Sequence, residues 1–154
     1  MKKYLVLALL SLTTLFTQAQ IVDPIQSSAQ LKTGKTAEGE IVFNLDIEQG
    51  WHVYSVNLGS SGPIEASFHV NKMDGVEKVG GLVARGNEIS KMDNLFGMKL
   101  RFFEHKAQFV QKVRFTKSNY TIDAYLEYGA CNDQTCMPPQ EVAFKKAGKS
   151  PAVE

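Results

Sequence analysis

Residues 108–128, QFVQKVRFTKSNYTIDAYLEY, are the stretch that decides the fold, because they read as two β-strands joined by a short turn. In the second half, every other position from Tyr120 to Tyr128 holds an apolar or aromatic side chain. A period of two is typical of a strand with one buried face. The first half, Gln108–Thr116, is rich in β-branched and aromatic residues, and residues 117–119 supply the turn.

Segments with the same character lie on both sides of this pair. Residues 40–48, EIVFNLDIE, place Ile41, Phe43, Leu45 and Ile47 on one face. Further strands are predicted at 51–57, at 65–71 and, after Pro138-Pro139, at 141–146. Between 76 and 88 the pattern is weak, and glycines at 80, 81 and 86 predict short strands joined by irregular backbone.

No apolar stretch with a period of 3.6 residues is long enough to predict a helix after residue 19. Short strands with a turn about every ten residues favour an all-β fold, an immunoglobulin-like antiparallel β-sandwich, with a barrel as the alternative. We expect the domain over residues 29–148, preceded by an irregular arm at 20–28 and followed by a tail at 149–154.

The first 19 residues have the pattern of a cleavable export signal. Lys2 and Lys3 precede an apolar run, and the small residues Thr17 and Ala19 flank a plausible cleavage site. The run is interrupted by Ser and Thr and is shorter than the roughly 20 residues that span a bilayer. We therefore expect cleavage after Ala19 and export of the protein.

The charge of the chain is close to balanced. It has 17 Lys and Arg against 16 Asp and Glu, for a net charge of +1, and there is no basic block. Removal of the signal would take away two lysines and no acid. This composition argues against nucleic acid or an anionic membrane surface as the main partner.

The only two cysteines, Cys131 and Cys136, enclose four residues in CNDQTC. Outside the cytosol such a pair is expected to be oxidised. The polar, turn-forming residues 132–135 predict a loop near solvent at the end of a strand, where a disulfide could exchange with other thiols. Spacing alone favours the other reading, an inert structural bridge that contributes roughly 2 kcal/mol.

Other cysteine chemistries have weaker support. Two thiolates would need further ligands to hold a metal, and His52, His69 and His105 are not spaced to supply them. No sequence context ties one of these histidines to a cysteine as in a hydrolase. We expect each histidine on the surface or on a strand face, and we expect no metal and no cofactor.

Three segments resemble the amino-terminal periplasmic domain of the thiol-disulfide interchange protein DsbD. YLEYGACNDQTCMPPQEVAF (125–144) resembles the family's cysteine loop, with Tyr before it and Pro-Pro behind it. KMDNLFGMK (91–99) resembles its cap loop, and QGWHVYSVN (49–57) its early aromatic strand. The resemblance implies an immunoglobulin-like fold, as expected from the strand pattern, and a redox-active disulfide.

The resemblance also implies roles for single residues. Cys136 matches the cysteine that forms the mixed disulfide with partners, and Cys131 the one that resolves it. Trp51, Tyr54 and Tyr128 match supporting aromatic positions.

In the cap, Asp93 to Gly97, Asp93 matches an acidic position where a carboxylate would disfavour the thiolate form of the cysteines. Leu95 stands where the family often has Phe, with Phe96 beside it, so either side chain could cover the disulfide. Asn94 replaces a second acidic residue.

The resulting hypothesis is a carrier that passes electrons from a thioredoxin-like reductant to oxidised periplasmic partners through a reversible Cys131–Cys136 disulfide. Because the sequence shows no membrane bundle and no thioredoxin-like domain, we expect a stand-alone chain served by a separately encoded membrane thiol carrier or another reductant. The alternative is an exported immunoglobulin-like binding or adaptor module whose disulfide is only structural.

Overall fold

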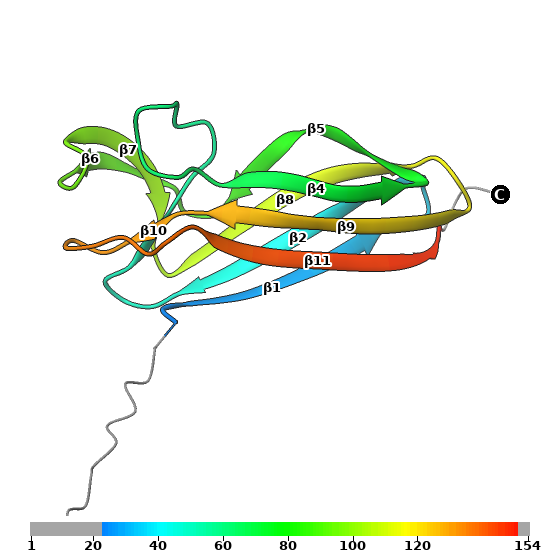
Figure 1. The fold of residues 1–154 in the computed structure, drawn as a ribbon, viewed down its shortest axis with the longest axis horizontal. Helices are drawn as coiled ribbons and strands as arrows, with labels where there is room; N and C mark the ends of the chain where they lie inside the picture. Colours follow the sequence, from blue (N-terminus) through cyan, green and yellow to red (C-terminus); the bar gives the residue numbers. More distant parts are fainter. Residues whose placement is uncertain (1–22, 151–154) are drawn as a thin grey trace, which may run out of the picture.

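The structure, a computed structural model, describes residues 23–150. The expected signal peptide at 1–19, the first residues of the arm and the last four residues of the tail lie outside this range. The described part is built from β-strands (Figure 1). It contains no helix that is long and apolar enough to cross a membrane.

Eleven strands follow one another along the chain. They are β1 (Ile25–Thr33), β2 (Glu38–Ile47), β3 (His52–Tyr54), β4 (Ser67–Asp74), β5 (Val76–Arg85), β6 (Ile89–Asp93), β7 (Met98–Phe103), β8 (Lys106–Phe115), β9 (Asn119–Tyr128), β10 (Ala130–Cys131) and β11 (Gln140–Lys149).

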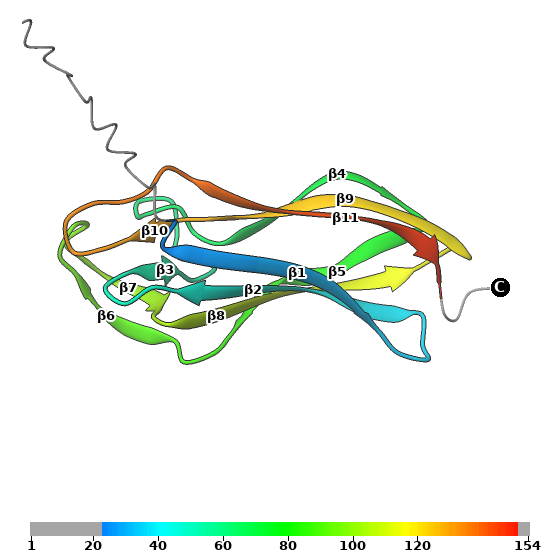
Figure 2. The same cartoon turned by 90° about the horizontal axis from the view of Figure 1, so that it is seen from below.

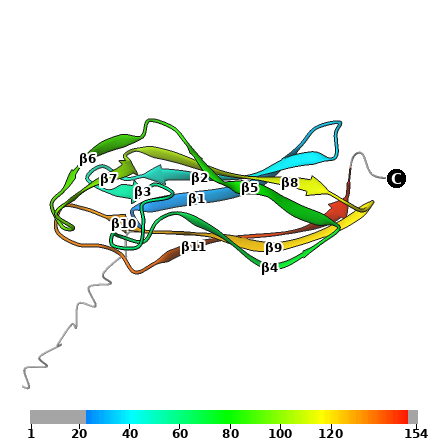
Figure 3. The same ribbon diagram turned by 90° about the horizontal axis from the view of Figure 1, so that it is seen from above.

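The strands pair antiparallel in three sheets. Sheets β1-β2-β8-β5 and β11-β9-β4 face each other as two layers (Figure 2). The third sheet, β10-β3-β7-β6, lies at one end, opposite the end where β11 finishes (Figure 3). The expected immunoglobulin-like β-sandwich is confirmed, in two layers rather than as a barrel.

The core between the layers comes from the strands with the clearest alternation. In β9 all five side chains predicted to face inward are buried, and β2 buries Ile41, Phe43, Leu45 and Ile47. On β8, Gln111 is buried as well, and its amide donates to the carbonyl oxygens of Val79 and Gly80. These carbonyls lie where the pairing of β5 with β8 shifts register.

Some segments differ from expectation. The irregular arm at 20–28 is wrong from Ile25 onward, because β1 begins there and pairs with β2 along its whole length. Its sequence, IQSSAQLKT, buries only Ile25, so this edge strand is held by the backbone ladder and carries no apolar period. β5 is one strand with an irregularity, and β11 is longer than the predicted 141–146.

Gly129 connects the sandwich to the cysteine loop. It separates β9 from β10 and accepts a hydrogen bond from the Tyr54 N–H, 3.1 Å away. A side chain here would place its Cβ 2.5 Å from the carbonyl oxygen of Ile64, so only glycine fits. At Gly129 the chain thus passes from the sheet of β9 into the sheet that contains β10 and β3.

Candidate thiol-disulfide site

Cys131 and Cys136 form a disulfide, with their Cα atoms 4.0 Å apart. They face each other as an antiparallel pair. Backbone hydrogen bonds flank the pair: Asn132 N–H donates to Thr135 O and Met137 N–H to Ala130 O, both at 2.9 Å. The cysteines therefore occupy a non-hydrogen-bonded position, where opposite side chains of antiparallel strands lie closest.

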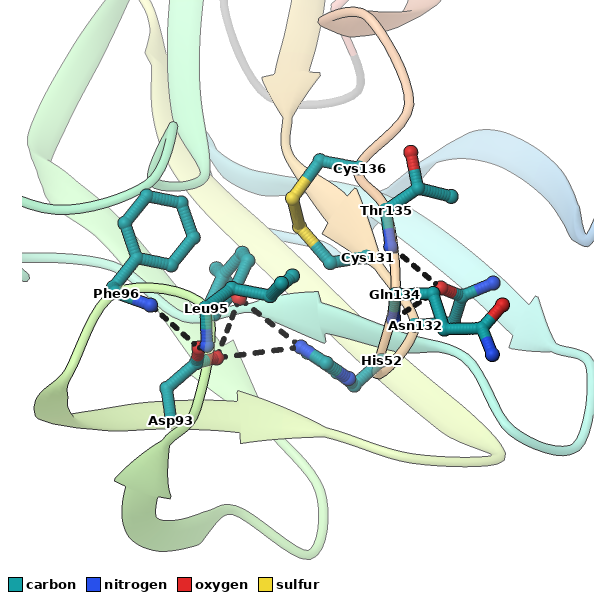
Figure 4. A network of polar contacts seen from close by, with 10 residues as sticks. His52, Asp93, Leu95, Phe96, Cys131, Asn132, Gln134, Thr135 and Cys136 are labelled. Atoms are coloured by element: carbon teal, nitrogen blue, oxygen red, sulfur yellow. Dashed lines mark hydrogen bonds and ion pairs between the residues drawn. A yellow bond between two sulfur atoms is a disulfide. The ribbon is translucent and has the colours of Figure 1, made fainter.

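The Asn132 side chain holds the turn between the cysteines. Its Oδ1 accepts from the N–H of Gln134 at 2.9 Å and of Thr135 at 2.8 Å (Figure 4). This is the local bonding that makes Asn a turn former. The sequence predicted a polar turn without assigning this role to Asn132, although an Asn directly after the first cysteine was the available signal.

The two cysteines lie in different environments. Cys131 is 1% exposed and packs with Tyr54, Leu100 and Phe102 in a small apolar cluster separate from the main core. Cys136 is an exposed residue. Because exchange requires access of the attacking thiolate to a sulfur, the disulfide offers Cys136 to an incoming group.

The cap loop, residues 93–97, joins β6 to β7 at the same end of the molecule as the cysteine loop (Figure 1). Asp93 organises it. Its Oδ1 accepts from the N–H of Leu95 at 2.9 Å and of Phe96 at 3.1 Å. Its backbone oxygen accepts from Gly97, whose φ of 64° favours glycine.

The second carboxylate oxygen of Asp93 faces β3. The Tyr54 hydroxyl donates to Oδ2 at 2.6 Å, and His52 Nε2 lies 3.1 Å from the same hydroxyl and 3.6 Å from Oδ2. The Tyr54 hydroxyl has a single hydrogen and uses it in the hydrogen bond to Asp93. The His52 Nε2 must therefore carry a hydrogen and donate to the Tyr54 oxygen.

Hydrogen bonding and burial set the ionisation of this group. Burial favours neutral Asp93, but hydrogen bonds from Tyr54, Phe96 and Leu95 outweigh it and lower the pKa of Asp93. The pKa of Tyr54 is raised by burial and by the adjacent carboxylate. Burial also lowers the pKa of His52, although Asp93 acts in the opposite direction. At neutral pH the site thus holds a charged Asp93 beside a neutral tyrosine and histidine.

Figure 4 shows the Phe96 ring and the Leu95 side chain on the side of the disulfide that faces the cap loop, and Leu95 lines a cavity with Asn132 and Asp133 of the cysteine loop. The Phe96 ring meets the Tyr54 ring edge to face, with centroids 5.9 Å apart. Phe96 is 37% exposed and Leu95 43%. Asn94 is exposed and lines a cavity of about 150 Å³ between the cap loop and the cysteine loop, which His52, Asp93, Asn132 and Asp133 also line.

The structure brings most of the sequence-predicted site residues together but places two elsewhere. Tyr128 is buried in the main core, and Trp51 packs against that core. His52, expected on a surface or strand face, lies on a strand face, where it is 8% exposed. Its link to Tyr54 was missed, although residues two apart on a strand share a face.

Within residues 23–150, no cluster of three or more His, Cys, Asp or Glu could hold a metal ion.

The site lies on a fold with known relatives. The N-terminal periplasmic domain of ScsB from Proteus mirabilis superposes with a TM-score of 0.58 at 13% identity, over 84% of this chain and 47% of that one. This chain thus spans about half the length of that relative. The N-terminal domain of Neisseria meningitidis DsbD in the reduced form gives a TM-score of 0.48 at 17% identity, over 79% of this chain and 84% of that one.

No curated protein matches the sequence. The family model described as thiol:disulfide interchange protein DsbD, N-terminal, matches residues 18–147, which include the cysteine loop and the cap loop. A match of this extent covers nearly all of the sandwich. The chain therefore belongs to the family of the N-terminal domain of the thiol:disulfide interchange protein DsbD.

Proposed function

We propose that this chain is a periplasmic electron carrier that cycles between the Cys131–Cys136 disulfide and a dithiol by direct exchange with thioredoxin-like proteins. The observation that carries the proposal is the asymmetry of the disulfide, with one exposed cysteine and one buried cysteine. A structural bridge needs no such difference in access. Electrons come from a thioredoxin-like reductant.

Reduction begins when a thiolate of the reductant attacks the sulfur of Cys136. The bond between the two sulfurs breaks, and Cys131 leaves with the electron pair and takes a proton from water. The second thiolate of the reductant then attacks the reductant's first sulfur in the mixed disulfide, and Cys136 leaves with the electron pair and takes a proton from water. The reductant ends as a disulfide and this chain as a dithiol, so two electrons have moved.

In the transfer to an oxidised partner, this chain is the electron donor and the same kind of exchange takes place. The Cys136 thiolate attacks the disulfide of an oxidised partner, and the partner's leaving sulfur takes a proton. Cys131 loses its proton, attacks Cys136 in the mixed disulfide and releases the reduced partner. The buried position of Cys131 suits resolution, because an internal thiol needs no access from outside.

The cap loop limits this exchange to partners that displace it. Phe96 and Leu95 lie on the side of the disulfide that faces the cap loop, and Asp93 keeps the loop in shape through Tyr54 and two backbone N–H groups. A charged Asp93 near the cysteines also disfavours the thiolate form once the disulfide is reduced. Both effects would protect the dithiol from chance oxidation.

Trapping tests the mechanism. The partner is a periplasmic thioredoxin-like protein that lacks its resolving cysteine and carries an aromatic thiol on its attacking cysteine. A Cys131→Ala variant should displace the aromatic thiol and accumulate a mixed disulfide through Cys136, visible on a non-reducing gel and by mass spectrometry.

Cys136→Ala is the matched control, because it also keeps one thiol, but a buried one. We expect it to react at least about tenfold more slowly, since its sulfur is shielded from the partner. Equal rates for the two variants, or no mixed disulfide with any periplasmic thioredoxin-like protein, would contradict the proposal.

A further inference from the structure

His52 stands at the junction between the disulfide and the cap loop. It pairs across the sheet with Cys131, so the two side chains project from the same face. Its ring lies against Phe102, with centroids 4.7 Å apart, and meets the Tyr54 ring edge to face at 5.0 Å. The proposed exchange reactions of Cys131 and Cys136 make no use of this side chain.

The hydrogen bonds give His52 a direct influence on the cap loop. Its Nε2–H donates to Tyr54, Tyr54 donates to Asp93, and Asp93 accepts the N–H groups of Leu95 and Phe96. The chain of bonds thus runs from β3 to the residues beside the disulfide (Figure 4). With Nε2 bound in this way, an added proton must go to Nδ1.

The surroundings of His52 decide what an added proton would do. The charged groups that face it are Asp93 and Lys91 of β6, Asp133 of the cysteine loop and Glu104 after β7. The carboxylates favour the imidazolium, and Lys91 opposes it. His52 is nevertheless only 8% exposed, and the desolvation of its ring outweighs the attraction of the carboxylates and lowers the pKa of His52.

Opening of the cap loop would change this balance. Asn94 and Leu95 line the same cavity as His52, so their departure would expose the ring to water. An imidazolium is better hydrated in the open state than in the closed one. By linkage, the state that binds the proton more tightly gains population as the pH falls.

We propose that His52 is a positioning residue that in its neutral form holds Tyr54, Asp93 and the cap loop in place, and that its protonation releases the cap loop from the disulfide. The inference rests on the proposed role of the cap loop as a cover. It adds a control of access by acidity to the proposed exchange reaction.

The first test compares reduction rates of the disulfide by a water-soluble phosphine, a small probe that works in acid solution. His52→Gln keeps an N–H donor for Tyr54 but does not titrate. The rate of the wild type divided by that of His52→Gln should be near one at about pH 7.5 and rise at least about threefold by about pH 5. The reactivity of the phosphine itself cancels in this ratio.

His69→Gln is the matched control. His69 is also a strand histidine, but its partners are Ser67, Tyr125 and Glu127, away from the cap loop. The reduction rate of the wild type divided by that of His69→Gln should stay near one over the same pH range. A wild-type to His52→Gln ratio that is flat, or that falls with acid, would overturn the proposal.

A second measurement needs no variant. Hydrogen-exchange protection factors of the Leu95 and Phe96 amides, which correct for the intrinsic effect of pH, should fall as the NMR signal of His52 titrates. Constant protection through that titration would overturn the proposal as well. Because neither test uses a thioredoxin-like protein, their failure is distinguishable from failure of the trapping experiment.

Discussion

A single carboxylate, Asp93, holds the cap loop to the rest of the site. It is 6% exposed and accepts from Tyr54, Leu95 and Phe96. Its removal would leave a buried hydroxyl and two N–H groups without an acceptor. A resemblance to a family cap suggested an electrostatic role for this residue, and the contacts add a structural one.

Asp93→Ala should therefore lower the free energy of unfolding by about 1–3 kcal/mol at neutral pH. The native pKa of Asp93 lies below its ordinary value of 3.8, so the charge contributes stability above that value. That part is lost as the pH falls through the native pKa. The difference between wild type and variant, measured by urea unfolding, should narrow between about pH 7 and about pH 3.

Asp46→Ala is a suitable control for this measurement. Asp46 pairs with Lys106 at 3.6 Å, but both side chains are mostly exposed, and surface pairs contribute little. We expect a change below about 0.5 kcal/mol. If the Asp93→Ala variant were as stable as this control, Asp93 would not be the residue that holds the cap loop in place.

The two cysteines could be named as the candidate site because they are the only ones in the sequence and lie close together, whereas Asp93 was named only through the resemblance to the family's cap loop. Tyr54 was named as a supporting aromatic, but its bond to Asp93, 39 positions away, was not foreseen. No local pattern encodes a contact across that distance. His52 was undervalued for the same reason, since its environment depends on how the cap loop folds back.

At the level of elements, prediction followed the strength of the apolar alternation. β2, β8 and β9 were recognised because each presents a regular buried face. β1 was missed because its residues are polar and its stability comes from pairing with β2. The hairpin β6–β7 was recognised as a cap by resemblance and not as strands, because β6 buries only Asp93.

The cap loop is the element on which access to the disulfide depends. If its apolar side chains shield the sulfurs, Leu95→Ala with Phe96→Ala should speed the reaction with glutathione several-fold. The two single variants then decide which side chain covers more of the disulfide. We expect the larger effect from Phe96→Ala, because this ring also packs on Tyr54.

Val83→Ala is the matched control for the cap variants. Val83 is an exposed apolar residue on β5, 49% accessible, in a different sheet from the cap loop. Its substitution should leave the glutathione rate unchanged. If the cap double variant also reacted at the wild-type rate, the loop would not be a cover.

For the molecule as a whole, the sandwich core and the redox site are largely separate. The main core joins the two facing sheets, whereas Cys131 belongs to the small cluster with Tyr54, Leu100 and Phe102. The sandwich class could be predicted because many strands repeat one simple pattern. A strand was predicted over β3, at 51–57, but its membership of a third sheet was not, because β3 and β10 are only three and two residues long.

This separation predicts that the protein stays folded when the disulfide is reduced. The ring closed by Cys131 and Cys136 is small, so opening it should lower the free energy of unfolding by only roughly 2 kcal/mol. An exchangeable bridge should also have a reduction potential above about −300 mV, in contrast to inert structural bridges. Equilibration with a thiol buffer measures the potential, and urea unfolding of both redox states measures the stability. Unfolding on reduction, together with a potential well below that value, would instead identify the structural bridge of an immunoglobulin-like binding module, because a carrier must keep the same fold in both halves of its cycle.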